Sequence, residues 1–213
     1  MTIQYDYYIK VLFLGDVGTG KTNIISNFCG NNFDEIHIPT IGLDFKTTFI
    51  DLDNLNNNPD NSKIKVQLID CSGNERFMSL LKNFSKKSEI LIMVYDVTKR
   101  NSLDNIEKWY KLLQNFNYNF NDDLVKILIG NKKDLTDSIR VGYNDGKALA
   151  DKYGMIFYDV SCKTENLRDI ILINNCRKVI ENSKKNEEQK NEAENTNLLL
   201  YKKKKSKKCC VIL

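Results

Sequence analysis

The chain lacks the residue patterns that stabilise small metal-binding or disulfide-linked proteins. It has a single histidine, His37, and its six cysteines show no C-x-x-C spacing. Zinc sites and disulfide frameworks need clustered ligands or regularly spaced cysteines, so we expect neither. Reduced thiols in a cytosolic protein fit this pattern better.

Long apolar runs are also absent. The longest, "ILIMVY" at 90–95, falls well short of the ~20 residues that a membrane-spanning helix needs. The first residues, "MTIQYDYYIK", do not have the pattern of a signal peptide. We therefore expect no membrane span and no secretory route. With 213 residues, 41% of them hydrophobic, the chain can bury the core of one ordinary domain followed by a tail.

Net positive charge is confined to one short segment, because basic and acidic residues nearly balance in the rest of the chain. Residues 202–208, "KKKKSKK", contain six lysines, and removing them from the net charge of +4 leaves about −2 for the rest of the chain. A nucleic-acid-binding domain usually has a basic face, so this distribution argues against nucleic acid as a partner.

The hydrophobic pattern predicts an α/β fold. Stretches with helical spacing, such as 102–116 and 143–154, separate most of the strand-like segments, which favours a mostly parallel sheet with helices on both faces. One pair of segments has no helix between them, which predicts one antiparallel strand and an Asn-rich hairpin tip at 53–62. The six segments expected to form strands are 8–14, 43–52, 64–70, 89–97, 125–131 and 155–160.

A phosphate-binding motif follows the first of these segments. Residues 15–22, "GDVGTGKT", fit G-x-x-x-x-G-K-[ST] between a strand and a helix. Backbone N–H groups of such a loop surround the β-phosphate, Lys21 neutralises phosphate oxygens, and the Thr22 hydroxyl binds Mg²⁺. A glycine-rich turn that only caps a helix would not need the Lys-Thr pair. Asp70, at the end of the third strand segment, is the acid expected to reach Mg²⁺ through water. The predicted contacts of this loop are Asp16, Val17, Gly18, Thr19, Gly20, Lys21, Thr22 and Asn23.

Two further motifs follow the fifth and sixth strand segments. They are "NKKD" at 131–134 and "SCK" at 161–163, and ligands bind at the carboxyl ends of parallel strands. With these loops in this order, the chain resembles the Ras superfamily of small GTPases over roughly residues 8–180. The stretches "IGLDF", "KVQLI", "RFMSLL" and "MVYDVT" resemble the Rab family in particular.

The resemblance implies a P-loop NTPase G domain in residues 1–180 that binds GTP or GDP with Mg²⁺. Asp134 would accept hydrogen bonds from the guanine ring N–H and amine, which rejects adenine because the carboxylate would lose its partners. Thr40 would sense the γ-phosphate through a metal site made of Thr22, Thr40 and Asp70, with Gly73 beside the phosphates. The residues assigned to the base are Phe33, Asn131, Lys132, Asp134, Ser161, Cys162 and Lys163.

The expected catalytic group is Lys21, Thr40 and Asn74, and it departs from the family at Asn74. The family carries a glutamine there, which orients the attacking water, and asparagine is shorter by roughly 1.5 Å. A misplacement of ~1 Å can cost about 100-fold in rate. Val17 stands where Rabs carry a small residue, and it would crowd the γ-phosphate and an arginine finger. We predict slow intrinsic hydrolysis, although activating proteins of Rabs supply an arginine and a glutamine in trans. The alternative is that Asn74 is a tolerated substitution.

The surface for effector proteins is also expected to be unusual. In Rabs an aromatic triad presents this surface, and the matching positions here are Phe45, Ile69 and Phe84, together with Ile41 and Gly42. Ile69 replaces the usual tryptophan.

From Glu181 onward the sequence is polar and charged, and we predict a disordered tail over 181–213. It ends in "KKKKSKKCCVIL", where Cys210 begins a C-a-a-X motif whose final leucine favours geranylgeranyl, and Cys209 extends it to a Rab-like doublet. Lipid and lysines together would attach the protein to the cytoplasmic face of intracellular membranes, with an extracted cytosolic pool.

Expected partners are effectors, an exchange factor, a GTPase-activating protein and a prenyl-binding chaperone. Two alternatives remain: a pseudo-GTPase scaffold that holds nucleotide permanently, and an ATP-using phosphotransferase, against which Asp134 and the lipid tail argue.

Overall fold

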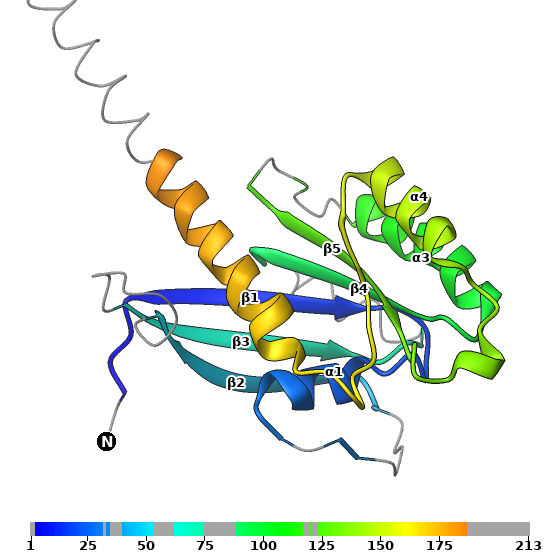
Figure 1. The fold of residues 1–213 in the computed structure, drawn as a ribbon. Coiled ribbons are helices and arrows are strands. Elements are labelled where there is room, and N and C mark those ends of the chain that lie inside the picture. Colours follow the sequence, from blue (N-terminus) through cyan, green and yellow to red (C-terminus); the bar gives the residue numbers. More distant parts are fainter. Residues whose placement is uncertain are drawn as a thin grey trace, which may run out of the picture.

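The computed structural model describes residues 3–31, 33–34, 40–52, 62–74, 88–116, 120 and 123–186. Within them six strands form one sheet in the order β2-β3-β1-β4-β5-β6 (Figure 1). β2 runs antiparallel to β3, and the other neighbouring pairs are parallel. The predicted fold class is therefore confirmed. The strands are β1 (Tyr7–Leu14), β2 (Leu43–Asp51), β3 (Lys63–Cys71), β4 (Ile90–Asp96), β5 (Val125–Asn131) and β6 (Ile156–Asp159).

Helices cover both faces of the sheet. On one face α1 (Lys21–Phe28) and the last helix pack on β1, β3, β4 and β5. On the other face lie α3 (Arg100–Asn115) and α4 (Tyr143–Tyr153) (Figure 1). The last helix begins with a π-helical turn, η4 (Arg168–Ile173), and continues as an α-helix over 174–186. A short 3₁₀ turn, η3 (Thr136–Ser138), precedes α4.

The burial of β4 explains why polar and apolar residues do not alternate in its sequence. All seven residues of β4 are buried, because helices pack on both faces of the strand. A parallel strand in this position reads as a continuous apolar run. Gly154 ends α4 in the left-handed conformation at φ 61°, as expected for a helix closed by glycine.

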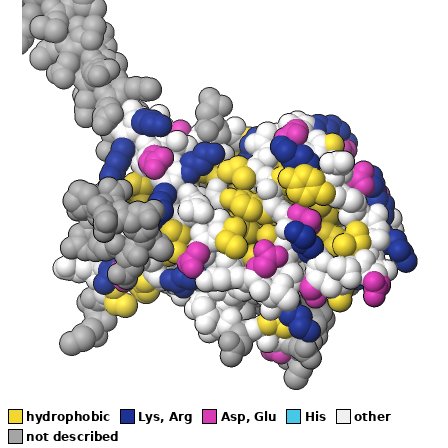
Figure 2. Space-filling view, viewed as in Figure 1, with side chains coloured by type: hydrophobic (Ala, Val, Ile, Leu, Met, Phe, Trp, Pro, Cys, Tyr) yellow, Lys and Arg dark blue, Asp and Glu magenta, His cyan; other side chains and the backbone are white. Residues whose placement is uncertain are grey.

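Several predictions lie outside the described residues, namely the hairpin tip at 53–61, Phe84, and the tail from 187 onward with Cys209 and Cys210. The last described helix runs to residue 186, past the predicted domain boundary at 180. Among the described helices, none combines the length and the apolar character needed to cross a membrane. Figure 2 shows lysine, arginine and acidic side chains intermixed over one face, with hydrophobic side chains gathered near its middle.

Candidate nucleotide site

The phosphate loop joins β1 to α1, and Lys21 folds back over it. The Lys21 ammonium donates hydrogen bonds to the carbonyl oxygens of Gly15 and Asp16, both at 2.8 Å. Only 6% of Lys21 is exposed, and burial lowers its pKa to about 8 although Asp70 acts in the opposite direction. A buried cation held only by neutral carbonyls is a strong attractor for a phosphate anion.

The three predicted metal ligands meet beside this lysine. Thr22 donates a hydrogen bond from Oγ1 to Asp70 Oδ2 at 2.5 Å, and Thr40 Oγ1 lies 3.1 Å from Thr22 Oγ1 and 3.3 Å from Asp70 Oδ2. Burial raises the pKa of Asp70, and the hydrogen bonds from both threonines work against that rise. The other carboxylate oxygen, Oδ1, is buried without a hydrogen-bond partner among the described residues.

An orphaned buried oxygen of this kind calls for a partner from outside the chain. Two hydroxyls and a carboxylate are hard oxygen donors, which is the chemistry that Mg²⁺ prefers. The residues present therefore fit the expected ion.

The base-binding motifs meet at the carboxyl ends of β5 and β6. Asn131 is fully buried; its amide donates to Thr19 O at 2.9 Å and its Oδ1 accepts from Cys162 N–H at 3.1 Å. It thus joins the phosphate loop to the SCK loop. Ser161 Oγ donates to Asp134 Oδ1 at 2.6 Å and orients that carboxylate. The two motifs are therefore in direct contact with each other.

Two of the residues assigned to the base contact each other. The Lys163 ammonium lies 5.6 Å from the centre of the Phe33 ring, within the range of a cation–π contact. Phe33 and Lys163 therefore lie side by side, although the sequence places them far apart.

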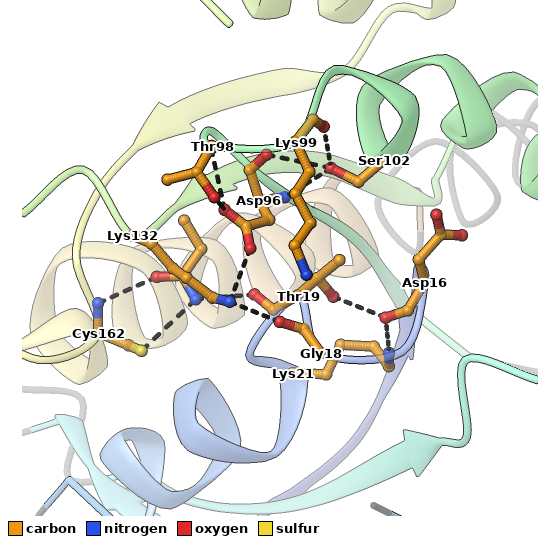
Figure 3. A network of polar contacts seen from close by, with 11 residues as sticks. Asp16, Gly18, Thr19, Lys21, Asp96, Thr98, Lys99, Ser102, Lys132 and Cys162 are labelled. Carbon is orange, nitrogen blue, oxygen red and sulfur yellow. Dashed lines mark hydrogen bonds and ion pairs between the residues drawn. The ribbon is translucent and has the colours of Figure 1, made fainter. Parts of the chain in front are cut away.

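A buried ion pair holds Lys132, and sequence reasoning missed its partner. Lys132 Nζ donates to Gly18 O and to Asp96 Oδ2, each at 2.7 Å (Figure 3). Asp96 is 1% exposed and also accepts from the hydroxyl and N–H of Thr98. Burial alone would raise the pKa of Asp96, but the hydrogen bonds from Lys132 and Thr98 outweigh it and lower the pKa. The available signal was an acid at the end of an apolar strand, as at Asp70.

Gly73 brings the end of β3 against the phosphate loop. A Cβ atom at Gly73 would lie 2.2 Å from Val17 N and 2.3 Å from Asp16 C, so only glycine fits there. Val17 itself is 51% exposed and lines a small cleft. Asn74 follows Gly73 directly. The cleft is lined by Val17, Gly18, Gly20, Lys21, Thr22, Thr40, Cys71, Ser72 and Gly73.

Other predicted residues bind protein groups or differ in exposure. The Asn23 amide donates to Asp34 O at 3.1 Å. Ile41 and Phe45 are 84% and 41% exposed, and Gly42 O accepts from a backbone N–H of the β3 end. Ile69 is paired with Phe45 across β2 and β3 but is only 1% exposed. It therefore lies beneath the surface and does not form part of it.

Asn27 is a second residue that sequence reasoning missed. From α1 its amide donates to Glu165 O at 2.9 Å and to Cys162 O at 3.4 Å, and its Oδ1 accepts from Leu167 N–H at 2.9 Å. One side chain thus holds both ends of the loop that follows β6. No local pattern marks this role, because the partners lie more than 130 positions away in the sequence.

The fold and the phosphate loop place the chain in the class of P-loop GTPases. The Ras family model matches residues 10–181. Similar curated proteins include the Ras-related protein RABE1e of Arabidopsis thaliana, 38% identical over 171 residues that cover 79% of this chain and 74% of that protein. The GTP-binding protein ypt2 of Schizosaccharomyces pombe is 37% identical over 163 residues, 76% of each chain. The Ras-related protein Rab-15 of Mus musculus is 35% identical over 170 residues, 79% of this chain and 76% of that protein. The chain belongs to the Ras family, as a Rab-like small GTPase.

Proposed function

We propose that this GTPase is a membrane-recruited switch that binds GTP or GDP with Mg²⁺, hydrolyses GTP slowly and regulates vesicle traffic. The observation that carries the proposal is the corner formed by Thr22, Thr40 and Asp70, which has an orphaned carboxylate oxygen and lies close enough to Lys21 for their charges to interact. Such a corner suits a divalent cation bound to a polyphosphate.

Nucleotide binding would use groups that are already in place. Lys21 would keep its two carbonyl partners and donate its remaining N–H to a phosphate oxygen, which gives the buried cation a counter-charge. Asp134, held by Ser161, would accept two hydrogen bonds from guanine. When bound, Mg²⁺ neutralises charge on the β- and γ-phosphates.

Switching would depend on Thr40. Its hydroxyl lies close to Thr22 and Asp70, so it would be held there while a γ-phosphate is present and released after hydrolysis. Ile41 and Phe45 follow in the chain and are exposed, which supports their proposed role in effector binding.

Slow hydrolysis is proposed from Asn74 and Val17. The shorter Asn74 amide would leave the attacking water poorly oriented, and the exposed valine would narrow the space beside the γ-phosphate. An activating protein that supplies its own arginine and glutamine would replace the missing function of Asn74. Its arginine would still be crowded by the Val17 side chain.

A single-turnover assay tests this proposal. The purified chain is loaded with γ-labelled GTP and Mg²⁺, and phosphate release is followed with and without a Rab-directed activating domain. We expect an intrinsic rate below ~10⁻⁴ s⁻¹, and a higher rate for Asn74→Gln or Val17→Ser. Asn144→Gln, the same change on the exposed surface of α4, is the control and leaves the rate unchanged. Ordinary Ras-like hydrolysis in the unmodified chain contradicts the slow rate. Bound GTP that is neither hydrolysed nor exchanged under any condition would instead indicate a scaffold.

Membrane recruitment is proposed from the tail sequence. We expect Cys210→Ser to move the protein from the membrane fraction to the cytosol when the two are separated from cells. Cys29→Ser, which changes a half-buried thiol of the domain, is the matched control and leaves the distribution unchanged. Full membrane retention of the Cys210 variant counts against the lipid anchor.

A further inference from the structure

The phosphate loop is attached to α3 through one side chain. Asp16 accepts a hydrogen bond at each carboxylate oxygen, from the Trp109 indole N–H at Oδ1 and from the Asn105 amide at Oδ2, both at 2.8 Å. These partners lie 89 and 93 positions away in the sequence and one helical turn apart on α3. Trp109 is buried and Asp16 is half-buried, so this contact is partly shielded from water.

The same residue positions the phosphate-binding lysine. The Asp16 carbonyl oxygen accepts from Lys21 Nζ at 2.8 Å and from Thr19 Oγ1 at 3.0 Å. Figure 3 shows this carbonyl facing Lys21 while the Asp16 carboxylate points away from it. The side chain therefore fixes the place of the backbone group that orients Lys21.

Asp16 also lies against the segment that leads to Asn74. The backbone of Gly73 approaches so closely that a Cβ there would lie 2.3 Å from Asp16 C. Asp16 thus contacts α3 through its side chain and this segment through its backbone. A displacement of the loop would move both the phosphate contacts and the start of that segment.

The helix that carries the two donors is itself fixed near its start. Ser102 Oγ donates to the carbonyl oxygens of Lys99 and Asp96 and accepts from Asp96 N–H. Asp96 in turn holds Lys132 of the base site. Hydrogen bonds therefore connect α3 both to the phosphate loop, through Asp16, and to Lys132, through Asp96.

We propose that Asn105 and Trp109 are positioning residues, and that their attachment to Asp16 sets how long a bound nucleotide stays in the site. The inference rests on the proposed nucleotide-binding function. In this proposal α3 slows nucleotide release by holding the phosphate loop in place, and α3 does not itself contact the nucleotide. The contact uses both oxygens of a carboxylate, and hydrogen bonds to charged groups are the strong ones in proteins.

Dissociation of fluorescent GDP from the full chain tests the proposal. Trp109→Phe keeps most of the buried ring but removes the N–H donor, and Asp16→Asn puts an amide donor opposite one of the two donors of α3. We expect each variant to release GDP about tenfold faster than the unmodified chain. Tyr8→Phe is the control; it removes one hydroxyl donor, bound to Gln67 Oε1 at 2.6 Å, far from the site. Its release rate should equal that of the unmodified chain.

The double variant separates positioning from general destabilisation. If Trp109 acts through Asp16, the combined variant releases GDP no faster than the faster single variant. The acceleration should persist when EDTA removes Mg²⁺, because the contact acts on Lys21 and the loop and not on the metal corner. Rates within twofold of the unmodified chain, or a double variant whose acceleration is the product of the two single effects, overturn the inference.

Two further measurements keep the outcomes distinct. Thermal unfolding with GDP bound shows whether each variant is folded, and Asn105→Ala, which leaves the tryptophan in place, replaces Trp109→Phe if the latter does not fold. If the unmodified chain binds no guanine nucleotide, the proposed function fails. If it binds GDP but all variants release it at the same rate, only the role of α3 fails.

Discussion

Replacement of Asp96 by asparagine should destabilise the protein, because this buried carboxylate has three donors. It accepts from Lys132 Nζ at 2.7 Å, from Thr98 Oγ1 at 2.6 Å and from Thr98 N–H at 2.9 Å. Asparagine has the same shape but no charge, and its amide nitrogen would face one of these donors. A hydrogen bond between charged groups contributes about 1.5–3 kcal/mol. The Lys132 side chain is 29% exposed, so water partly screens the ion pair and the loss should lie below the upper end of this range. We expect Asp96→Asn to lower the free energy of unfolding by about 2 kcal/mol.

Urea denaturation at a fixed excess of GDP measures this loss, and the chain offers a matched control. Lys152 and Glu107 are also 2.7 Å apart, but their side chains are 58% and 33% exposed. Glu107→Gln should therefore cost less than about 0.5 kcal/mol. Equal and small losses in the two variants would refute the reasoning that burial makes the Asp96 pair strong.

The effect should also depend on pH with a definite sign. The pKa of Asp96 is lowered in the folded protein, so the unfolded chain takes up a proton at a higher pH than the folded chain does. The stability that the carboxylate contributes is complete above the ordinary aspartate pKa of about 3.9 and is lost as the pH falls through the lower folded value. The difference between the native chain and Asp96→Asn should therefore be constant from about pH 6 to 8 and shrink below about pH 4.

Three further changes give distinct outcomes. Gly20→Ala should weaken GDP binding at least ~10-fold more than Gly18→Ala in a fluorescence titration. Both glycines have positive φ, but only at Gly20 would a Cβ meet Asn131 Nδ2, at 2.3 Å; equal affinities would contradict this. Arg168→Lys should lower the free energy of unfolding by about 1–2 kcal/mol, because one ammonium cannot replace a guanidinium that donates to three acceptors on α1 and β2; an unchanged urea midpoint would contradict it. Asp134→Asn should abolish the preference for GDP over IDP in competition binding. IDP lacks the exocyclic amine, whose hydrogen bond the Asp134 carboxylate would accept from GDP. A retained preference would show that another group recognises the base.

The central strands of the sheet could be predicted closely because they are buried on both faces. Residues 125–131 were expected to form a strand and do so as Val125–Asn131. The antiparallel strand also followed from sequence, since no helix separates Leu43–Asp51 from Lys63–Cys71. In each case a local pattern of apolar residues predicts the strand, because residues that the folded sheet buries must be apolar.

The supporting side chains of the site could not be predicted in the same way. The phosphate and base motifs were visible because their chemistry requires fixed spacing within one loop. Asp96 ends a strand whose sequence fits a core strand as well as a site, and Asn27 and Trp109 find partners about 90 to 140 positions away. At Ile69 the resemblance was misleading. It assigned this residue to the effector surface, but the side chain is buried in this chain. Contacts of this kind depend on how the elements pack, and no local pattern records that packing.

The contact between Trp109 and Asp16 also has a practical consequence. Trp109 is the only tryptophan of the chain, so tryptophan fluorescence of the unlabelled protein would come from this single indole. Its N–H is bonded to a residue of the phosphate loop, and indole emission responds to the polarity and hydrogen bonding around it. The native chain thus carries an optical probe next to its nucleotide loop, through which nucleotide exchange would be followed without any attached dye.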